Sequence, residues 1–297
     1  MLARAKKTSI GVVLLFGVCG VAQAQDAVDT DWKLTSKVGV SLSQSSFNSA
    51  WAGDEVGTFS WIATWNSSAS KVLAPWAQWK NRLLMQFGQT HQQDPERQNW
   101  QSPSKSSDKI TYRGEMLFPV GGWVKPFAAL DVDSQFFTRI KGVVTKRFTP
   151  TLVTESIGVA RSFRDTDQLK LESRLGFAVK QRIDRLAFDT AAMDYFTRTS
   201  NDGGFEWFST VRVASKEDRA VYASELRVFK AVATNQSNPV TRQYWPSVDV
   251  DWQNTLSSKV TSWLSFDLFW QVLFDKQIDK TGQYKQTLGV GLTWQLL

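Results

Sequence analysis

The sequence predicts an all-β protein, a transmembrane antiparallel β-barrel of about twelve strands preceded by a cleaved signal peptide. Three observations lead to this prediction. Apolar and polar residues alternate with period two in segments of mostly 11 to 16 residues, whereas strands of soluble proteins average about 5–6 residues. The connections between these segments are alternately short and long. The composition is rich in aromatics, with 19 Phe and 14 Trp, but contains one His and one Cys.

The first 24 residues have the pattern of a secretory signal peptide. Arg4, Lys6 and Lys7 form a basic start, residues 10–21 are an apolar run, and Ala22-Gln23-Ala24 is a small-x-small cleavage site. The apolar run is shorter than the ~20 residues that a spanning helix needs. We therefore expect residues 1–24 to be removed and residues 25–297 to form one outer-membrane barrel domain.

Composition also limits the chemistry that the mature chain could perform. Cleavage would remove Cys19, the only cysteine, and would lower the formal net charge from +7 to +4, too little to indicate a nucleic-acid partner. One histidine and no thiol leave too few ligands for a zinc site. His91 is the only candidate base near neutral pH, and it falls in an expected loop. The sequence predicts no enzyme, no cofactor and no metal site.

Twelve segments carry the alternation. The segment 260–274, for example, sets Leu264, Phe266 and Leu268 on one face against Ser265 and Asp267 on the other. Such a pattern is typical of a strand with one face on an apolar medium and one on a polar interior. The predicted strands are 32–43, 57–70, 77–90, 109–118, 123–138, 152–163, 167–182, 204–215, 219–232, 244–257, 260–274 and 284–296.

The connections after even-numbered strands are short, at 71–76, 119–122, 164–166, 216–218 and 258–259. Those after odd-numbered strands are long, at 44–56, 91–108, 139–151, 183–203, 233–243 and 275–283. Bacterial outer-membrane barrels have short periplasmic turns and long extracellular loops. The sequence therefore predicts a location in the outer membrane of a Gram-negative bacterium, with both termini in the periplasm. Outer-membrane lipid, and the barrel-assembly machinery during insertion, are the partners that this location implies.

The alternation also fixes which side chains face the interior. A Lys or Arg facing lipid at mid-bilayer costs roughly 2–4 kcal/mol, and a shift of one residue would move every side chain to the other face. Trp32, Trp76, Trp123 and Trp245 fall near strand ends, as girdle residues do. The predicted pore-lining residues are Arg82, Arg113, Glu115, Asp131, Asp133, Glu172, Arg174, Arg212, Glu225, Arg227, Asp249, Asp251 and Asp267.

Several short motifs resemble a family of bacterial outer-membrane barrels known only as a domain of unknown function. They span roughly residues 32–137, and they comprise Trp51-Ala52-Gly53, Trp79-Lys80-Asn81, Phe87-Gly88, Ser107-Asp108-Lys109-Ile110 and Ser134-Gln135-Phe136. Ala50 and Asp54 depart from the first motif of that family, and Ser134 replaces a threonine in the last. The resemblance implies an outer-membrane barrel and no established activity.

Two functions remain open from the sequence. Charged interior walls select small solutes in porin-like channels, which indicates a narrow channel or binder for small hydrophilic solutes. The alternative is a closed structural or interaction barrel that acts through its extracellular loops and is filled by paired charges. For the acid pairs Asp131/Asp133 and Asp249/Asp251, the available basic partners are four arginines of the predicted pore lining, namely Arg82, Arg113, Arg212 and Arg227.

Overall fold

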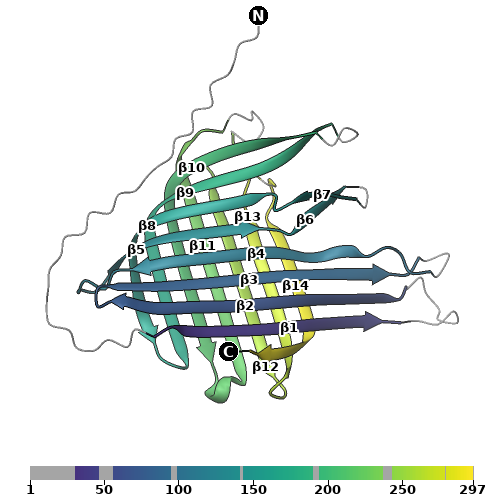
Figure 1. Cartoon of the computed structure of the whole chain (residues 1–297), viewed down its shortest axis with the longest axis horizontal. Helices are drawn as coiled ribbons and strands as arrows, with labels where there is room; N and C mark the ends of the chain where they lie inside the picture. The colour runs from purple at the N-terminus through teal and green to yellow at the C-terminus, as the bar shows by residue number, and fades with distance from the viewer. Residues whose placement is uncertain are drawn as a thin grey trace, which may run out of the picture.

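The computed structural model describes residues 31–46, 56–94, 99–140, 143–189, 194–236, 243–277 and 279–296. The predicted signal peptide lies outside these residues. Within them, the chain forms a closed antiparallel barrel of twelve strands, in the order β1-β14-β13-β12-β11-β10-β9-β8-β5-β4-β3-β2 (Figure 1). The predicted fold, a closed barrel of twelve antiparallel strands, is therefore confirmed. No helix in the described ranges is long and apolar enough to cross a membrane.

The first half of the barrel comprises β1 (Lys33–Ser45), β2 (Thr58–Ala74), β3 (Ala77–Gln92), β4 (Ser104–Leu117), β5 (Lys125–Ser134) and β8 (Thr151–Asp165). The second half comprises β9 (Leu169–Asp189), β10 (Asp194–Ala214), β11 (Ala220–Thr234), β12 (Val248–Lys259), β13 (Leu264–Phe274) and β14 (Gln283–Gln295). A separate hairpin, β6 (Phe137–Ile140) with β7 (Val143–Arg147), leaves the barrel between β5 and β8. A single 3₁₀ turn, η1 (Lys216–Asp218), joins β10 to β11.

The structure differs from the predicted boundaries at the end of the barrel where the long connections lie. β9 and β10 are 21 residues each and pair from Leu169↔Val213 to Asp189↔Asp194, so most of the expected loop 183–203 is strand. Figure 1 shows this hairpin extending past its neighbours. A hairpin that projects beyond the apolar band needs backbone pairing but no apolar face, so it carries no alternating signal.

Two further boundaries move for the same reason. β4 begins at Ser104, because polar residues before the expected start pair with the end of β3. β3 itself runs to Gln92, so His91 lies on a strand beside Phe59, with ring centroids 6.3 Å apart, and not in a loop as expected. The predicted strand 123–138 ends at Ser134, and the expected loop 139–151 contains much of the β6–β7 hairpin.

The other end of the barrel has tight turns. Gly121 and Gly122 connect β4 to β5 with φ of +95° and +93°, a backbone conformation that residues with a Cβ rarely adopt. In the β10–β11 turn, Arg212 donates to Asp218 across 2.8 Å. This hydrogen bond lowers the pKa of the Asp218 carboxyl below its ordinary value. These connections are the short ones that the sequence predicts.

The outer face of the barrel exposes large apolar side chains. Leu288 is 68% exposed, and Leu175 and Phe205 are each 57% exposed. Burial of one such side chain is worth about 1.5–3 kcal/mol, so a band of them in water would be strongly unfavourable. A hydrocarbon environment removes this cost. It also requires every backbone group to be paired, which the closed sheet achieves.

Tryptophans on this outer face repeat one contact three times. Trp65, Trp207 and Trp252 each donate the indole N–H to a serine hydroxyl on the neighbouring strand. The acceptors are Ser36, Ser173 and Ser224, at 3.0, 2.8 and 3.0 Å. In each case the serine lies two residues from the residue that pairs with the tryptophan. The contact pairs two polar groups that hydrocarbon could not solvate.

Two tyrosines make the equivalent contact. Tyr112 donates to Asn81 across 2.7 Å, and Tyr222 donates to Asn254 across 2.8 Å. Asn254 is 1% exposed, although it lies on the outward face, and the ring of Tyr222 stacks on Trp270 beside it. The aromatic side chains of the outer face therefore cover the polar side chains that the alternation places among them.

We expect Ser173→Ala to lower the free energy of unfolding by about 1–2 kcal/mol, because the indole N–H of Trp207 loses its acceptor in an apolar setting. Chemical unfolding of the barrel in lipid vesicles measures this. Adding Trp207→Phe to Ser173→Ala should recover most of the loss, since removal of both partners leaves no unpaired group. If Ser173→Ala unfolds like the wild type, the hydrogen bond contributes nothing to stability.

Candidate functional site: the barrel interior

The centre of the interior is a cluster of arginines and acids. Arg174 on β9 contacts three carboxylates: Asp131 at 2.7 Å, Glu115 at 3.0 Å and Glu206 at 3.4 Å. The side chains of Arg174, Asp131 and Glu206 are 5%, 1% and 2% exposed. Strands β4, β5, β9 and β10 supply these four residues, and the alternation points all four side chains inward.

An aromatic ring supports the guanidinium groups. The centres of the Arg174, Arg113 and Arg227 guanidinium groups lie 4.5, 4.9 and 5.2 Å from the centroid of the Phe208 ring. Arg227 also pairs with Asp131 and, at 3.4 Å, with Glu206. Cation–π contacts of this kind are stronger when the groups are removed from water. The inward aromatic thus stabilises three cations at once.

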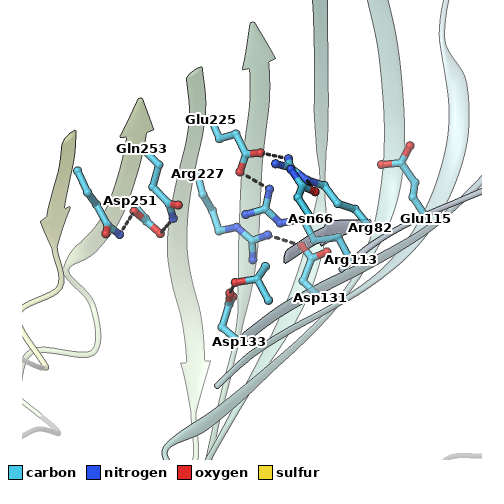
Figure 2. A network of polar contacts seen from close by, with 12 residues as sticks. Asn66, Arg82, Arg113, Glu115, Asp131, Asp133, Glu225, Arg227, Asp251 and Gln253 are labelled. Carbon is cyan, nitrogen blue, oxygen red and sulfur yellow. Dashed lines mark hydrogen bonds and ion pairs between the residues drawn. The ribbon is translucent and has the colours of Figure 1, made fainter. Parts of the chain in front are cut away.

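Ion pairs extend from this centre across the lumen. Arg82 on β3 pairs with Glu225 on β11 at 2.5 Å, and Arg113 on β4 pairs with the other oxygen of Glu225 (Figure 2). β3 and β11 stand six places apart in the ring of twelve strands, so this contact spans the full width of the barrel. Lys109 on β4 reaches Gln253 on the opposite strand β12 in the same way, across 2.6 Å.

The cluster balances its own charge. Four cations (Arg82, Arg113, Arg174 and Arg227) face four anions (Glu115, Asp131, Glu206 and Glu225). Removing an isolated charge from water costs several kcal/mol, which only close pairing offsets. The exposure is graded across the cluster. The Arg174 and Asp131 side chains are buried, whereas that of Arg82 is 43% exposed. One side of the cluster therefore faces water.

The other predicted pore-lining residues are also held by polar contacts. Asp249 pairs with Lys180 at 2.7 Å, and Glu172 with Lys80 at 3.4 Å. Asp251 accepts from the amides of Gln253 and Gln271, Asp133 from Thr111, and Asp267 from Ser257 and Ser265. Their role in lining a pore stays a prediction.

Of the four arginines available to the acid pairs, one binds an acid of these pairs directly. Asp131 pairs with Arg227, but Asp249 pairs with Lys180, and Arg212 is bound to Asp218 at the short-turn end. Arg212 lies three residues from the expected end of its strand, too far from the acids of β12 to reach them. Charge complementarity along the sequence does not specify the level in the barrel at which two side chains meet.

Several residues of the interior are absent from the predicted pore lining. Glu206, Lys180 and Lys109 have the inward parity of their strands, so the alternation alone could have identified them. Phe208 also has inward parity. Its role as a platform for three guanidinium groups had no signal in the sequence, because aromatic residues on both faces of this strand read as ordinary packing.

The wall formed by β14, β1, β2 and β3 differs from the clustered side. Its inward residues are mainly hydroxyl-bearing or glycine, such as Ser41, Ser43, Thr64, Gly289 and Gly291. The inward side chains Thr35, Lys37 and Ser43 of β1 are exposed, whereas the inward side chains Thr154 and Ser156 of β8 are 1% and 4% exposed. The inward side chains are therefore more deeply buried around the cluster than at these positions of β1.

A pocket lies beside the cluster, towards the short turns. Lys80, Lys125, Arg161, Glu172 and Arg174 contribute to its lining. Within the described residues, no group of three or more His, Cys, Asp or Glu side chains could hold a metal ion. The described interior presents fixed charges and hydroxyl groups.

Three of the five motifs that resemble a family come together away from the lumen. Trp79-Lys80-Asn81 lies at the other end of β3, and Trp51-Ala52-Gly53 lies outside the described residues. The Asp108 carboxylate, whose side chain is 2% exposed, accepts from the backbone N–H of Phe136 at 2.6 Å and from Lys105 at 2.8 Å. Lys105 also donates to Gln135, and the Phe87 and Phe136 rings meet edge to face. We call Phe87, Lys105, Asp108, Gln135 and Phe136 the clasp. It holds the start of the β6–β7 hairpin against the start of β4.

The comparison with family models agrees with the motif resemblance. A family described as "Protein of unknown function (DUF3078)" matches residues 42–139, about a third of the chain. This stretch contains the whole clasp, and the predicted resemblance to a family of unknown function is confirmed over it. No curated protein sequence matches the chain.

Solved structures with a similar fold are bacterial outer-membrane barrels. The translocator domain of the autotransporter NalP from Neisseria meningitidis is 11% identical, with a TM-score of 0.36, over 87% of this chain and 86% of that one. An outer membrane channel from Pseudomonas putida F1 is 9% identical, with a TM-score of 0.41, over 88% and 94%. The NanC porin is 9% identical, with a TM-score of 0.35, over 87% and 98%.

We expect Arg174→Met to lower the free energy of unfolding by about 3–5 kcal/mol, because it removes one of the two cations that neutralise the buried carboxylates of Asp131 and Glu206. Arg212→Met is the matched control. It removes the same group from a half-exposed pair at the rim, worth below about 1 kcal/mol. Chemical unfolding in lipid vesicles compares the two. Equal losses would contradict the central role given to the cluster.

We expect Asp108→Ala to release the β6–β7 hairpin while the barrel stays closed, because the clasp loses the acceptor for two backbone N–H groups. Limited trypsin digestion of the folded protein should then cut within residues 137–147 faster than in the wild type. Asp165→Ala, which removes an exposed carboxylate at the short-turn end, is the control and should leave that cleavage rate unchanged.

Proposed function

We propose that the protein is an outer-membrane barrel that conducts small hydrophilic solutes along an off-centre path. One observation carries the proposal: the inward side chains Thr35, Lys37 and Ser43 of β1 are exposed and Ser41 is half-buried, whereas Asp131, Arg174 and Glu206 at the centre of the cluster are buried. Twelve strands enclose more than the eight that side chains alone can fill, and less than the 16 or so of an open porin. With one side of the lumen filled by the cluster, the path runs beside the β14–β1–β2–β3 wall.

The surface of the barrel supports the membrane part of this proposal. Apolar side chains cover the outside, and the indole N–H of Trp207 and the hydroxyl of Tyr222 there are hydrogen-bonded. With the long connections outside the cell and the short turns in the periplasm, both termini are periplasmic. Outer-membrane lipid and the assembly machinery are then the partners during and after insertion.

The alternative function is a closed barrel that acts through its extracellular loops. The cross-lumen pairs Arg82–Glu225 and Lys109–Gln253 favour it, because each spans the full width of the barrel. The two functions differ in one measurable property. A path beside the cluster admits small charged reagents to β1, whereas a closed lumen does not.

We expect Ser41→Cys to react with a small anionic thiol reagent and to lose conductance when it reacts. After signal cleavage the barrel would contain no other thiol. Single channels in planar lipid bilayers measure the conductance before and after the reagent is added. The conductance should fall because the group attached to the thiol narrows the path.

Two control variants locate the path. Leu42→Cys places the thiol on the outward face of the same strand, and Thr154→Cys places it inward but beneath the cluster, where the side chain is 1% exposed. Neither should change the conductance. A wild-type barrel that is electrically silent, or equal blocking at Ser41 and Thr154, would overturn the proposal and favour the closed barrel.

A further inference from the structure

We propose, on the basis of the function above, that the path selects small anions. The charged residues of the wall that borders the path are all basic. Strands β14, β1, β2 and β3 contain no Asp or Glu in their described lengths. Five of their inward residues are basic: Lys285, Lys33, Lys37, Lys80 and Arg82. Cationic side chains along a pore favour anions and repel cations.

These cations are accessible along the whole path. Lys285 is exposed near the long-connection end of β14, and Lys37 is exposed towards the short-turn end of β1. Neither forms an ion pair with a residue in the described part of the chain. Arg82 lies between them in the lumen with its side chain 43% exposed. A solute would therefore meet positive charge at both ends and in the middle.

Most acids of the central cluster lie on its buried side, away from the path. Arg82 and Arg113 share the single carboxylate of Glu225, so the side of the cluster that faces the path keeps one excess positive charge. The compensating excess of acid lies on the buried side, where Glu115, Asp131 and Glu206 surround Arg174 and Arg227. The cluster is neutral as a whole but presents its positive end to the solute.

Four further acids lie close enough to matter. Asp251 accepts from Gln271, which pairs with Lys285 of β14, and Asp218, which is bound to Arg212, lies within electrostatic reach of Lys37. Asp267 lies against Gly291 of β14, where its carboxylate accepts from both Ser257 and Ser265. Glu172 is 45% exposed and paired with Lys80. Against these stand the basic residues of the wall, so positive charge remains in excess beside the path. Low dielectric walls focus the field of such an excess into the lumen.

Reversal potentials in planar bilayers under a potassium chloride gradient test the inference. The wild-type barrel should show a chloride-to-potassium permeability ratio above one, and the ratio should decline as the total salt is raised, because salt screens exposed charges. In Lys37→Gln with Lys285→Gln, the ratio should fall towards one at low salt while single-channel openings persist.

A matched variant removes the same amount of charge elsewhere. Lys216→Gln with Arg219→Gln changes two cations in the β10–β11 turn, outside the wall of the path, and should keep the wild-type ratio. A conducting wild type with a ratio at or below one overturns the anion inference while the channel stands. Equal shifts in both double variants would also overturn it. A silent wild type would instead contradict the proposed channel.

Discussion

The buried pairing of charge inside the barrel is the constraint on which the rest of the structure depends. Arg174 is 5% exposed, and its contacts with Asp131 and Glu206 are made where water cannot replace a lost partner. Each of these charges would cost several kcal/mol if left alone. The positions of β5, β9 and β10 relative to one another are therefore fixed by the need to keep every charge in contact with its counterion.

The ion pairs of the interior and the apolar outer face both fix the register of the same strands. A shift of β9 by one residue would remove Arg174 from its carboxylates and would turn its charges towards lipid, so both faces specify the same register. On the outer face, the Trp207–Ser173 contact also depends on that register. The strand is thus held by an ion cluster on one side and by an aromatic hydrogen bond on the other.

The sequence was sufficient for the features that depend on local periodicity. It predicts twelve strands, the face of each and the short turns, because apolar and polar surroundings act residue by residue. The sequence was not sufficient to predict which interior charges pair with one another. Arg82 and Glu225 are 143 residues apart, and their contact depends on strand tilt and on the width of the lumen. The extension of β9 and β10 was also missed, since strand pairing beyond the apolar band needs no alternation.

The clasp shows a third kind of information, which the sequence contains only in scattered form. Phe87, Asp108 and Gln135 belong to three separate motifs, and the structure gathers them around one hairpin. Their chemistry is that of a fixed joint, with a buried carboxylate accepting two backbone N–H groups and one ammonium. Motifs that suggest a functional site can therefore mark the place where a chain leaves a barrel and returns to it.

The cluster fills one side of the interior because only the strands on that side supply acids as well as cations. A cluster that fills the whole lumen would need complementary acids on β14, β1, β2 and β3, and these strands have none. Lys80 and Arg82 take their partners from acids of β9 and β11, whereas Lys37 is exposed and forms no ion pair within the described residues. The exposed Lys37 supports the proposed path on this side, because a charge without an ion-pair partner and a dry, packed lumen exclude one another.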